Sequence, residues 1–238
     1  MIKNQKFLSK RTDISIFLTH LTRDTDWGNA KENLISIINE LTIRAYSHYC
    51  LFSPILKNEL PKIQNKFNVV CLTETPLNNI SLLVDIPNRQ IDLKPYGILF
   101  KKSTLVKEYG VNPVFYAYDE ELLNYFKDQY NRYINEYKDR KKGTKTSSNY
   151  LKFYELGALI NKVGENHDFH WEREWRIKGN LNFNITDIFS IIAPEHEHKS
   201  IKEAVIDEDI KKIPFIDIKW SIEEIVEQFA FQMWCIGE

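Results

Sequence analysis

The sequence predicts an α+β domain with a split, mostly antiparallel central sheet flanked by helices. Residues 96–118 read as a strand, a short helix and a second strand, which together make a compact α+β unit. A long amphipathic helix pattern follows at residues 120–140, and short runs rich in β-branched and aromatic residues recur before and after it. With 238 residues, 43% of them hydrophobic, the chain can bury a full core, so we expect one domain over residues 1–238.

Three elements are expected in the first third of the chain. Residues 14–22 form a run of β-branched and aromatic residues, which predicts a strand whose end carries His20 and Thr22. A helix is expected over residues 29–41, because apolar residues recur there at helical spacing. Residues 65–73 read as a buried strand that a following proline brings to an end.

The middle of the chain predicts a strand, a helix and a strand in close succession. The two strands are expected at residues 96–101 and 112–118. Between them, residues 103–109 predict a short helix with Ser103 as its N-cap and Gly110 as its C-cap.

A long helix over residues 120–140 is the next expected element. Its core-facing residues are expected to be Leu122, Leu123, Tyr125, Phe126 and Tyr130. Residues 138–149 are polar and basic, and we interpret them as a solvated surface, with a nucleic-acid contact as the alternative.

The rest of the chain alternates short strands and helices. We expect a helix at 150–163, a strand at 189–194, a helix at 199–206, a strand at 215–218 and a helix at 221–233. Ser221 is expected to cap the last helix, since two glutamates lie in its first turn. The sequence contains no Gly-rich phosphate loop, zinc ribbon or serine-nucleophile elbow, which argues against the common nucleotide-binding and hydrolase folds.

The stretch from His170 to Arg176 (HWEREWR) concentrates charged and aromatic residues. As a strand, it would send Trp171, Arg173 and Trp175 to one face and His170, Glu172, Glu174 and Arg176 to the other. The tryptophan face would then be structural, and the second face would be a candidate site, because buried charges must be paired with one another. A solvated edge strand with ion pairs across it remains the alternative.

Composition narrows the possible partners and the cellular compartment. With 32 basic and 33 acidic residues, the net charge is −1, so no global field draws the chain to nucleic acid or to an anionic membrane. Cys50, Cys71 and Cys235 have neither the number nor the spacing of a disulfide or zinc framework, and we expect buried thiols in a reducing compartment. The N-terminus lacks the apolar core of a signal peptide and no apolar run is long enough to span a membrane, so a cytoplasmic protein is expected.

Three segments carry a family resemblance. They are residues 71–77 (CLTETPL), residues 96–116 with YGILFKK and GVNPVFY at their two ends, and residues 171–176 (WEREWR). In order and spacing they resemble the AbiGi-type abortive-infection proteins of bacterial phage resistance. The resemblance implies a role in phage defence and a cognate toxin or antitoxin as partner.

The order of polar residues is also similar to that of ADP-ribosyltransferases, particularly DNA-modifying toxins with a His-x-Thr pair on the first strand. That resemblance implies an ADP-ribosyltransferase-like fold with NAD as substrate and a nucleic-acid or protein acceptor. Glu174, with Glu172 beside it, would be catalytic and would stabilise the positive charge that develops on the ribose. The cofactor-binding residues would be His20, Thr22, Tyr96, Tyr116, Arg173 and Arg176, with one tyrosine stacked on the nicotinamide and an arginine on the pyrophosphate.

Two other classes of function stay open. A metal-dependent nuclease could place Mg²⁺ or Mn²⁺ among Glu74, His170, Glu172 and Glu174, whereas the transferase requires no metal ligands. A non-enzymatic antitoxin or phage sensor would use the same surfaces to bind a partner protein. For His20 the alternative is a locally satisfied side chain, and for Tyr96 and Tyr116 it is core packing.

Overall fold

The computed structural model describes residues 12–84, 86, 91–139, 156–163 and 169–236. The chain divides into two compact units. Unit 1 comprises Met1–Ile43, Leu72–Gly110 and Asn182–Glu238, and unit 2 comprises Arg44–Cys71 and Val111–Leu181. The prediction of a single domain stays a prediction.

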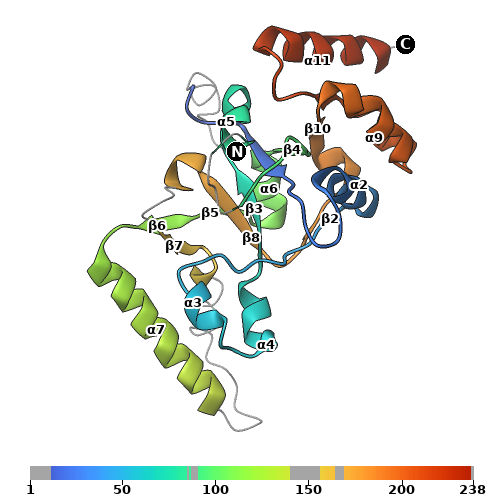
Figure 1. The fold of residues 1–238 in the computed structure, drawn as a ribbon. Helices are drawn as coiled ribbons and strands as arrows, with labels where there is room; N and C mark the ends of the chain where they lie inside the picture. The colour runs from blue at the N-terminus through green and yellow to red at the C-terminus, as the bar shows by residue number, and fades with distance from the viewer. Residues whose placement is uncertain (1–11, 85, 87–90, 140–155, 164–168, 237–238) are drawn as a thin grey trace. The chain divides into compact units, whose positions relative to one another are not determined.

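Unit 1 carries most of the strands (Figure 1). Its elements are β1 (Phe17–Leu21), α2 (Ala30–Glu40), β2 (Thr42–Ile43), the end of β3 (Val69–Thr73), η2 (Leu77–Asn79), α5 (Ser81–Val84), β4 (Gly97–Lys101), α6 (Lys102–Tyr109), the end of β9 (Leu181–Asn182), η4 (Ile185–Asp187), β10 (Ile188–Ile192), η5 (Glu195–Glu197), α9 (His198–Ala204), α10 (Glu208–Lys211), β11 (Phe215–Ile216) and α11 (Ile222–Ile236).

The strands of unit 1 pair in the order β11-β10-β4-β1-β3. The pairs β10–β4, β4–β1 and β1–β3 are antiparallel, and β10–β11 is parallel. In the register of β1 and β4, Thr19 lies opposite Leu99 and Leu21 opposite Gly97. One face of these strands buries an aliphatic core made of Leu21, Ile80, Leu83, Leu99, Ile192, Ile216, Ile218 and Ile225.

Helix ends in unit 1 follow the expected capping chemistry. Asn29 and Glu32 form a capping box at the start of α2, where each side chain accepts from the other residue's backbone N–H. Ser221 and Glu224 do the same at the start of α11. Gly110 ends α6 in a left-handed conformation, as predicted.

Unit 2 contains fewer strands and the longest helix. Its elements are α3 (Ser53–Leu56), α4 (Pro61–Gln64), η1 (Asn65–Phe67), the start of β3, β5 (Asn112–Pro113), β6 (Phe115–Ala117), α7 (Glu120–Asp139), β7 (Ile160–Lys162), η3 (Phe169–Glu172) and β8 (Glu174–Lys178). Its strands pair in the order β3-β8-β5, and β6 pairs in parallel with β7. Most strand pairs within unit 1 are antiparallel, and in unit 2 β5 and β8 are antiparallel, so the mostly antiparallel pairing that the sequence predicts is confirmed.

The core of unit 2 is aromatic. Phe52 and Tyr130 stack with ring centroids 4.7 Å apart, and Phe67 meets both rings edge-on. Tyr130 comes from α7, so ring packing holds the long helix to the start of α3, where Phe52 is the N-cap, and to Phe67 of η1.

Several predicted boundaries are wrong. Lys101, not Ser103, occupies the N-cap of α6, and it makes no side-chain capping bond. The expected helix at 150–163 gives way to β7 over its described end, because residues 160–162 pair with β6. Tyr125, expected to face the core, is 58% exposed.

The expected strand at 112–118 divides at Val114. Asn112 and Pro113 pair with β8, and from Phe115 onward the chain pairs with β7. The backbone N–H of Val114 donates to the carbonyl of Glu174, so the two pairings meet at this residue.

The expected strand through Trp171 begins later than predicted. Phe169–Glu172 is a 3₁₀ helix, and Arg173 takes a left-handed backbone with φ of 48°. A non-glycine residue in this conformation interrupts a strand, because strand residues need an extended backbone. The alternation therefore holds only from Glu174 onward, and Trp171, expected in the core, is 46% exposed.

Candidate functional site

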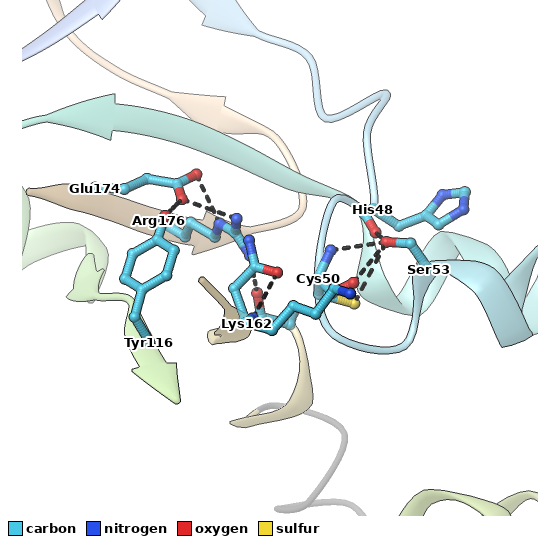
Figure 2. A network of polar contacts seen from close by, with 9 residues as sticks. His48, Cys50, Ser53, Tyr116, Lys162, Glu174 and Arg176 are labelled. Atoms are coloured by element: carbon cyan, nitrogen blue, oxygen red, sulfur yellow. Dashed lines mark hydrogen bonds and ion pairs between the residues drawn. The ribbon is translucent and has the colours of Figure 1, made fainter. Parts of the chain in front are cut away.

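A buried cluster of charged and polar side chains in unit 2 is built on β8. Because side chains alternate along a strand, Glu174 and Arg176 project to the same face, roughly 7 Å apart along the chain. Tyr116 on β6 reaches the same place. Figure 2 shows its phenol directed at the Glu174 carboxylate. We call Tyr116, Glu174, Arg176 and the neighbouring Cys71 the β8 cluster.

Two nitrogens of Arg176 donate hydrogen bonds to the Glu174 carboxylate. Its Nε lies 2.8 Å from Oε1 and its Nη2 lies 2.9 Å from Oε2, which is a bidentate pair. The third nitrogen, Nη1, donates to the carbonyl of Ala158 at 2.9 Å. The Tyr116 hydroxyl donates to Oε2 of Glu174 at 2.5 Å. Arg176 is only 2% exposed, so its charge is compensated by these contacts rather than by water.

The pairing determines which protonation states are stable. Burial by itself would raise the pKa of the Glu174 carboxyl, but the charge and hydrogen bonds of Arg176, with the hydrogen bond from Tyr116, lower it below its ordinary value. Burial and the adjacent Glu174 charge raise the pKa of Tyr116. Burial works against the Arg176 charge, but Glu174 outweighs it and raises the pKa. The cluster is therefore a carboxylate, a guanidinium and a neutral phenol.

Cys71, from β3, completes the surroundings of the carboxylate. Burial raises the pKa of its thiol, and the nearby Glu174 charge raises it further. The protonated thiol is in hydrogen-bond contact with Glu174 and helps to lower the pKa of that carboxyl. Such a thiol is a poor nucleophile, because the thiolate is the reactive form.

The donors around Glu174 occupy the hydrogen-bond acceptor positions of its carboxylate. An ionised carboxylate offers about four acceptor positions on its two oxygens. Arg176 takes two, Tyr116 takes one, and the Cys71 thiol is a further donor. A ribose hydroxyl or a metal ion at Glu174 would have to displace one of these partners.

The other predicted residues of unit 2 lie beside this cluster in sequence. Glu172 is buried at the end of η3, and Arg173 is half-buried at the left-handed turn. The left-handed backbone at Arg173 breaks the alternation that was expected to place Glu172 on the face of Glu174.

His20, Thr22 and Tyr96 belong to unit 1. The Thr22 hydroxyl is buried and donates to the carbonyl of Ala30 at 2.8 Å, and its backbone N–H donates to the carbonyl of Tyr96. The Tyr96 hydroxyl donates to Glu197 at 2.8 Å. His20 is half-buried on β1, opposite Ile98. The structure thus brings Thr22 and Tyr96 together in unit 1 and Tyr116, Glu174 and Arg176 together in unit 2. Their assignment to NAD stays a prediction.

Sequence reasoning missed one buried charged pair in unit 1. The Nζ of Lys102 lies 2.5 Å from Oε1 of Glu74 and 2.7 Å from the carbonyl of Ser15. From the sequence, Glu74 is a candidate only as a metal ligand. The signal was present in the motifs, because the acid before Pro76 and the lysine after the Tyr-Gly strand are two of the residues that carry the family resemblance.

No metal-binding group stands out in the part of the chain that the structure describes. Among those residues no three His, Cys, Asp or Glu side chains are arranged to hold a metal ion. Glu74 and Glu174, two of the ligands considered for a nuclease, each carry a cationic partner instead. The side chain of His170 lies outside the described part.

The fold and the cluster define a mixed α/β protein in which an internal network of paired charges is built on β8. A family model described as "Putative abortive phage resistance protein AbiGi, antitoxin" matches residues 56–226, more than two thirds of the chain. The chain belongs to this AbiGi family. The resemblance stated from three motifs is confirmed, and membership indicates a role in abortive phage resistance.

No curated protein and no solved structure matches the chain. No helix within the described residues is both long and apolar enough to cross a membrane.

Proposed function

We propose that this chain is an antitoxin of a phage-defence pair that neutralises a toxin by binding it, without a chemical step of its own. The observation that carries the proposal is that protein donors already occupy the hydrogen-bond acceptor positions of Glu174, the residue that the sequence favours as catalytic. Its carboxylate is engaged by Arg176 and Tyr116 and has the Cys71 thiol beside it. A group that acts on a transition state must direct an oxygen at the substrate, and here the donors on those oxygens come from the protein itself.

The family description supports the same conclusion. The matching family is described as an antitoxin of abortive phage resistance, which implies a toxin as the binding partner. A buried, paired arginine also fits a structural role, because Tyr116 and the carbonyl of Ala158 connect the pair to neighbouring segments and losing one partner would leave a buried charge uncompensated. In this reading the β8 cluster holds unit 2 in the shape that a partner recognises.

ADP-ribosyl transfer is the competing proposal. It would require Glu174 to exchange Arg176 or Tyr116 for the ribose of NAD, and the arginine would then stay buried without its carboxylate. The antitoxin proposal requires no such exchange. We therefore place the transferase second, and the metal-dependent nuclease behind it.

Co-expression tests the first proposal. Each gene of the chain's own locus would be induced in a bacterial host with and without this chain, and growth would be followed. We expect one gene to stop growth and this chain to restore it through a complex that co-elutes in size-exclusion chromatography. Growth restored without a stable complex, or no growth-inhibiting partner in the locus, contradicts the proposal.

A second assay separates binding from NAD chemistry. Purified chain would be incubated with labelled NAD, alone and with bacterial extract or DNA, and the release of nicotinamide would be measured. The antitoxin proposal predicts no release above a heat-treated control. Release that is lost in a folded Glu174→Gln variant would instead establish the transferase.

A further inference from the structure

An exposed aromatic and acidic surface lies on α7 and β6 of unit 2. It consists of Phe115, Glu121, Tyr125 and Asp128, and we call it the α7 patch. Phe115 is 51% and Tyr125 is 58% exposed, although large aromatic side chains tend to be buried. Both acidic residues are exposed as well.

Both aromatic rings of the α7 patch pack against Phe126. Phe126 packs against the core of unit 2 and lies 6.2 Å from the ring of Phe115 and 6.1 Å from that of Tyr125, measured between centroids. The exposed rings therefore sit on a fixed base. Because they are already held in place, a partner would lose little conformational freedom in contacting them.

The carboxylates flank the tyrosine on the same helix face. Glu121 lies four residues before Tyr125 and Asp128 three residues after it, the spacings at which side chains share a face. Within the described residues neither carboxylate is in an ion pair. Glu121 lies in the first turn of α7 and also complements the helix dipole, but Asp128 is beyond that turn and has no such role.

Aromatic residues suit one kind of partner when the acids beside them form no ion pair with another described residue. Tyrosine and phenylalanine are enriched where protein interfaces lose water, and charges at the rim select a partner of opposite sign. A lysine or arginine could pair with Asp128 while resting on the ring of Tyr125. Nucleic acid is disfavoured at this surface, because its phosphates would face the carboxylates.

We propose that the α7 patch is the surface by which this chain binds its toxin, and that the toxin presents a basic rim around an apolar pocket. This inference rests on the proposed antitoxin function and names the surface and the partner's chemistry. The rings would fill the pocket, and Glu121 and Asp128 would pair with the basic rim.

Binding of the toxin found by co-expression tests the inference. Affinity would be measured by calorimetry for the wild-type chain, Tyr125→Ala and Asp128→Lys, with melting temperatures recorded for each. The matched controls are Phe231→Ala, an exposed ring on α11, and Glu227→Lys, an exposed acid on the same helix.

We expect each patch variant to weaken binding by about tenfold or more and both controls to bind within about twofold of wild type. The wild-type affinity should also fall as salt is raised, and less steeply for Asp128→Lys. If Tyr125→Ala lowers the melting temperature, Asp128→Lys decides the question, because its side chain is exposed.

Failure of this inference and failure of the antitoxin proposal look different. If the wild-type chain restores growth and binds the toxin while both patch variants bind equally well, the α7 patch is wrong and the antitoxin function stands. If the wild-type chain neutralises no toxin of its locus, the antitoxin proposal fails and the α7 patch falls with it.

Discussion

Arg176 forms a bidentate ion pair with Glu174, which lies two residues earlier on the same strand. The pair lets β8 bury a full guanidinium in unit 2, because the carboxylate that neutralises it arrives on the same strand face. Tyr116 and the carbonyl of Ala158 take the remaining directions and link β8 to its neighbours. In the structure the charges of Glu174 and Arg176 are therefore paired with each other.

Loss of the Glu174 charge should destabilise the protein. Glu174→Gln leaves the buried Arg176 without a counter-charge, and breaking a buried pair on one side typically costs about 3–5 kcal/mol. We expect a clear drop in the free energy of unfolding measured with urea.

The double variant Glu174→Leu/Arg176→Met is the control for that prediction. Replacing both charges with apolar groups of similar size removes the uncompensated charge, so it should be more stable than either single variant. A Glu174→Gln variant as stable as wild type would show that the pair does not hold unit 2 together.

Stability should fall in acid through the same residue. The pKa of Glu174 is lower in the folded chain than its ordinary value of 4.5, so the unfolded chain takes up its proton at the higher pH. The contribution is therefore fully present above that value and is lost as the pH falls through the folded pKa. Urea unfolding between neutral pH and pH 3 should show this loss, and the double variant should show less of it. Identical pH profiles for the two would contradict the assignment.

The thiols of Cys50 and Cys71 should be unreactive in the folded protein. Burial raises both pKa values, so little thiolate forms at neutral pH. In a Cys235→Ser background, iodoacetamide followed by peptide mass spectrometry should label both residues only after denaturant is added. Fast labelling of native Cys71 would show that the β8 cluster opens readily.

Gly97 should resist substitution because of a close backbone contact. A Cβ at this position would lie 2.2 Å from the backbone carbonyl oxygen of His20. Gly97→Ala must separate two paired strands, and we expect a cost of about 1–3 kcal/mol or more. At Gly110 a Cβ meets nothing within 4 Å. Gly110→Ala should therefore lower the stability only by the about 1–2 kcal/mol that a non-glycine residue costs in a left-handed conformation. A Gly97→Ala variant that melts at or above Gly110→Ala would refute the close contact.

Local patterns predicted much of the fold. The β-branched run before Thr22 is β1, and the helical spacing after Asn29 is α2 with its capping box. These elements depend on neighbours in sequence, which single-chain patterns report well. The strand at 112–118 was harder, because it changes partner at Val114 and long-range pairing leaves no mark in the local pattern.

The sequence predicted that Glu174 and Arg176 share a strand face, but it did not predict that they pair with each other. The alternation rule placed Glu174 and Arg176 on one face correctly, and it failed at Arg173, where the backbone turns left-handed. Nothing in the sequence showed that Arg176 would turn back onto Glu174 instead of facing a ligand. A paired buried charge and a catalytic charge use the same residue types, and only their partners distinguish them.

Growth rescue by the folded Glu174→Leu/Arg176→Met variant tests the central claim most directly. The variant would be co-expressed with the toxin, after circular dichroism and urea unfolding had established that it is folded. If the β8 cluster is structural and the chain acts by binding, the variant should restore growth as the wild type does. A folded variant that binds the toxin but no longer restores growth would contradict this account and return Glu174 to a catalytic role.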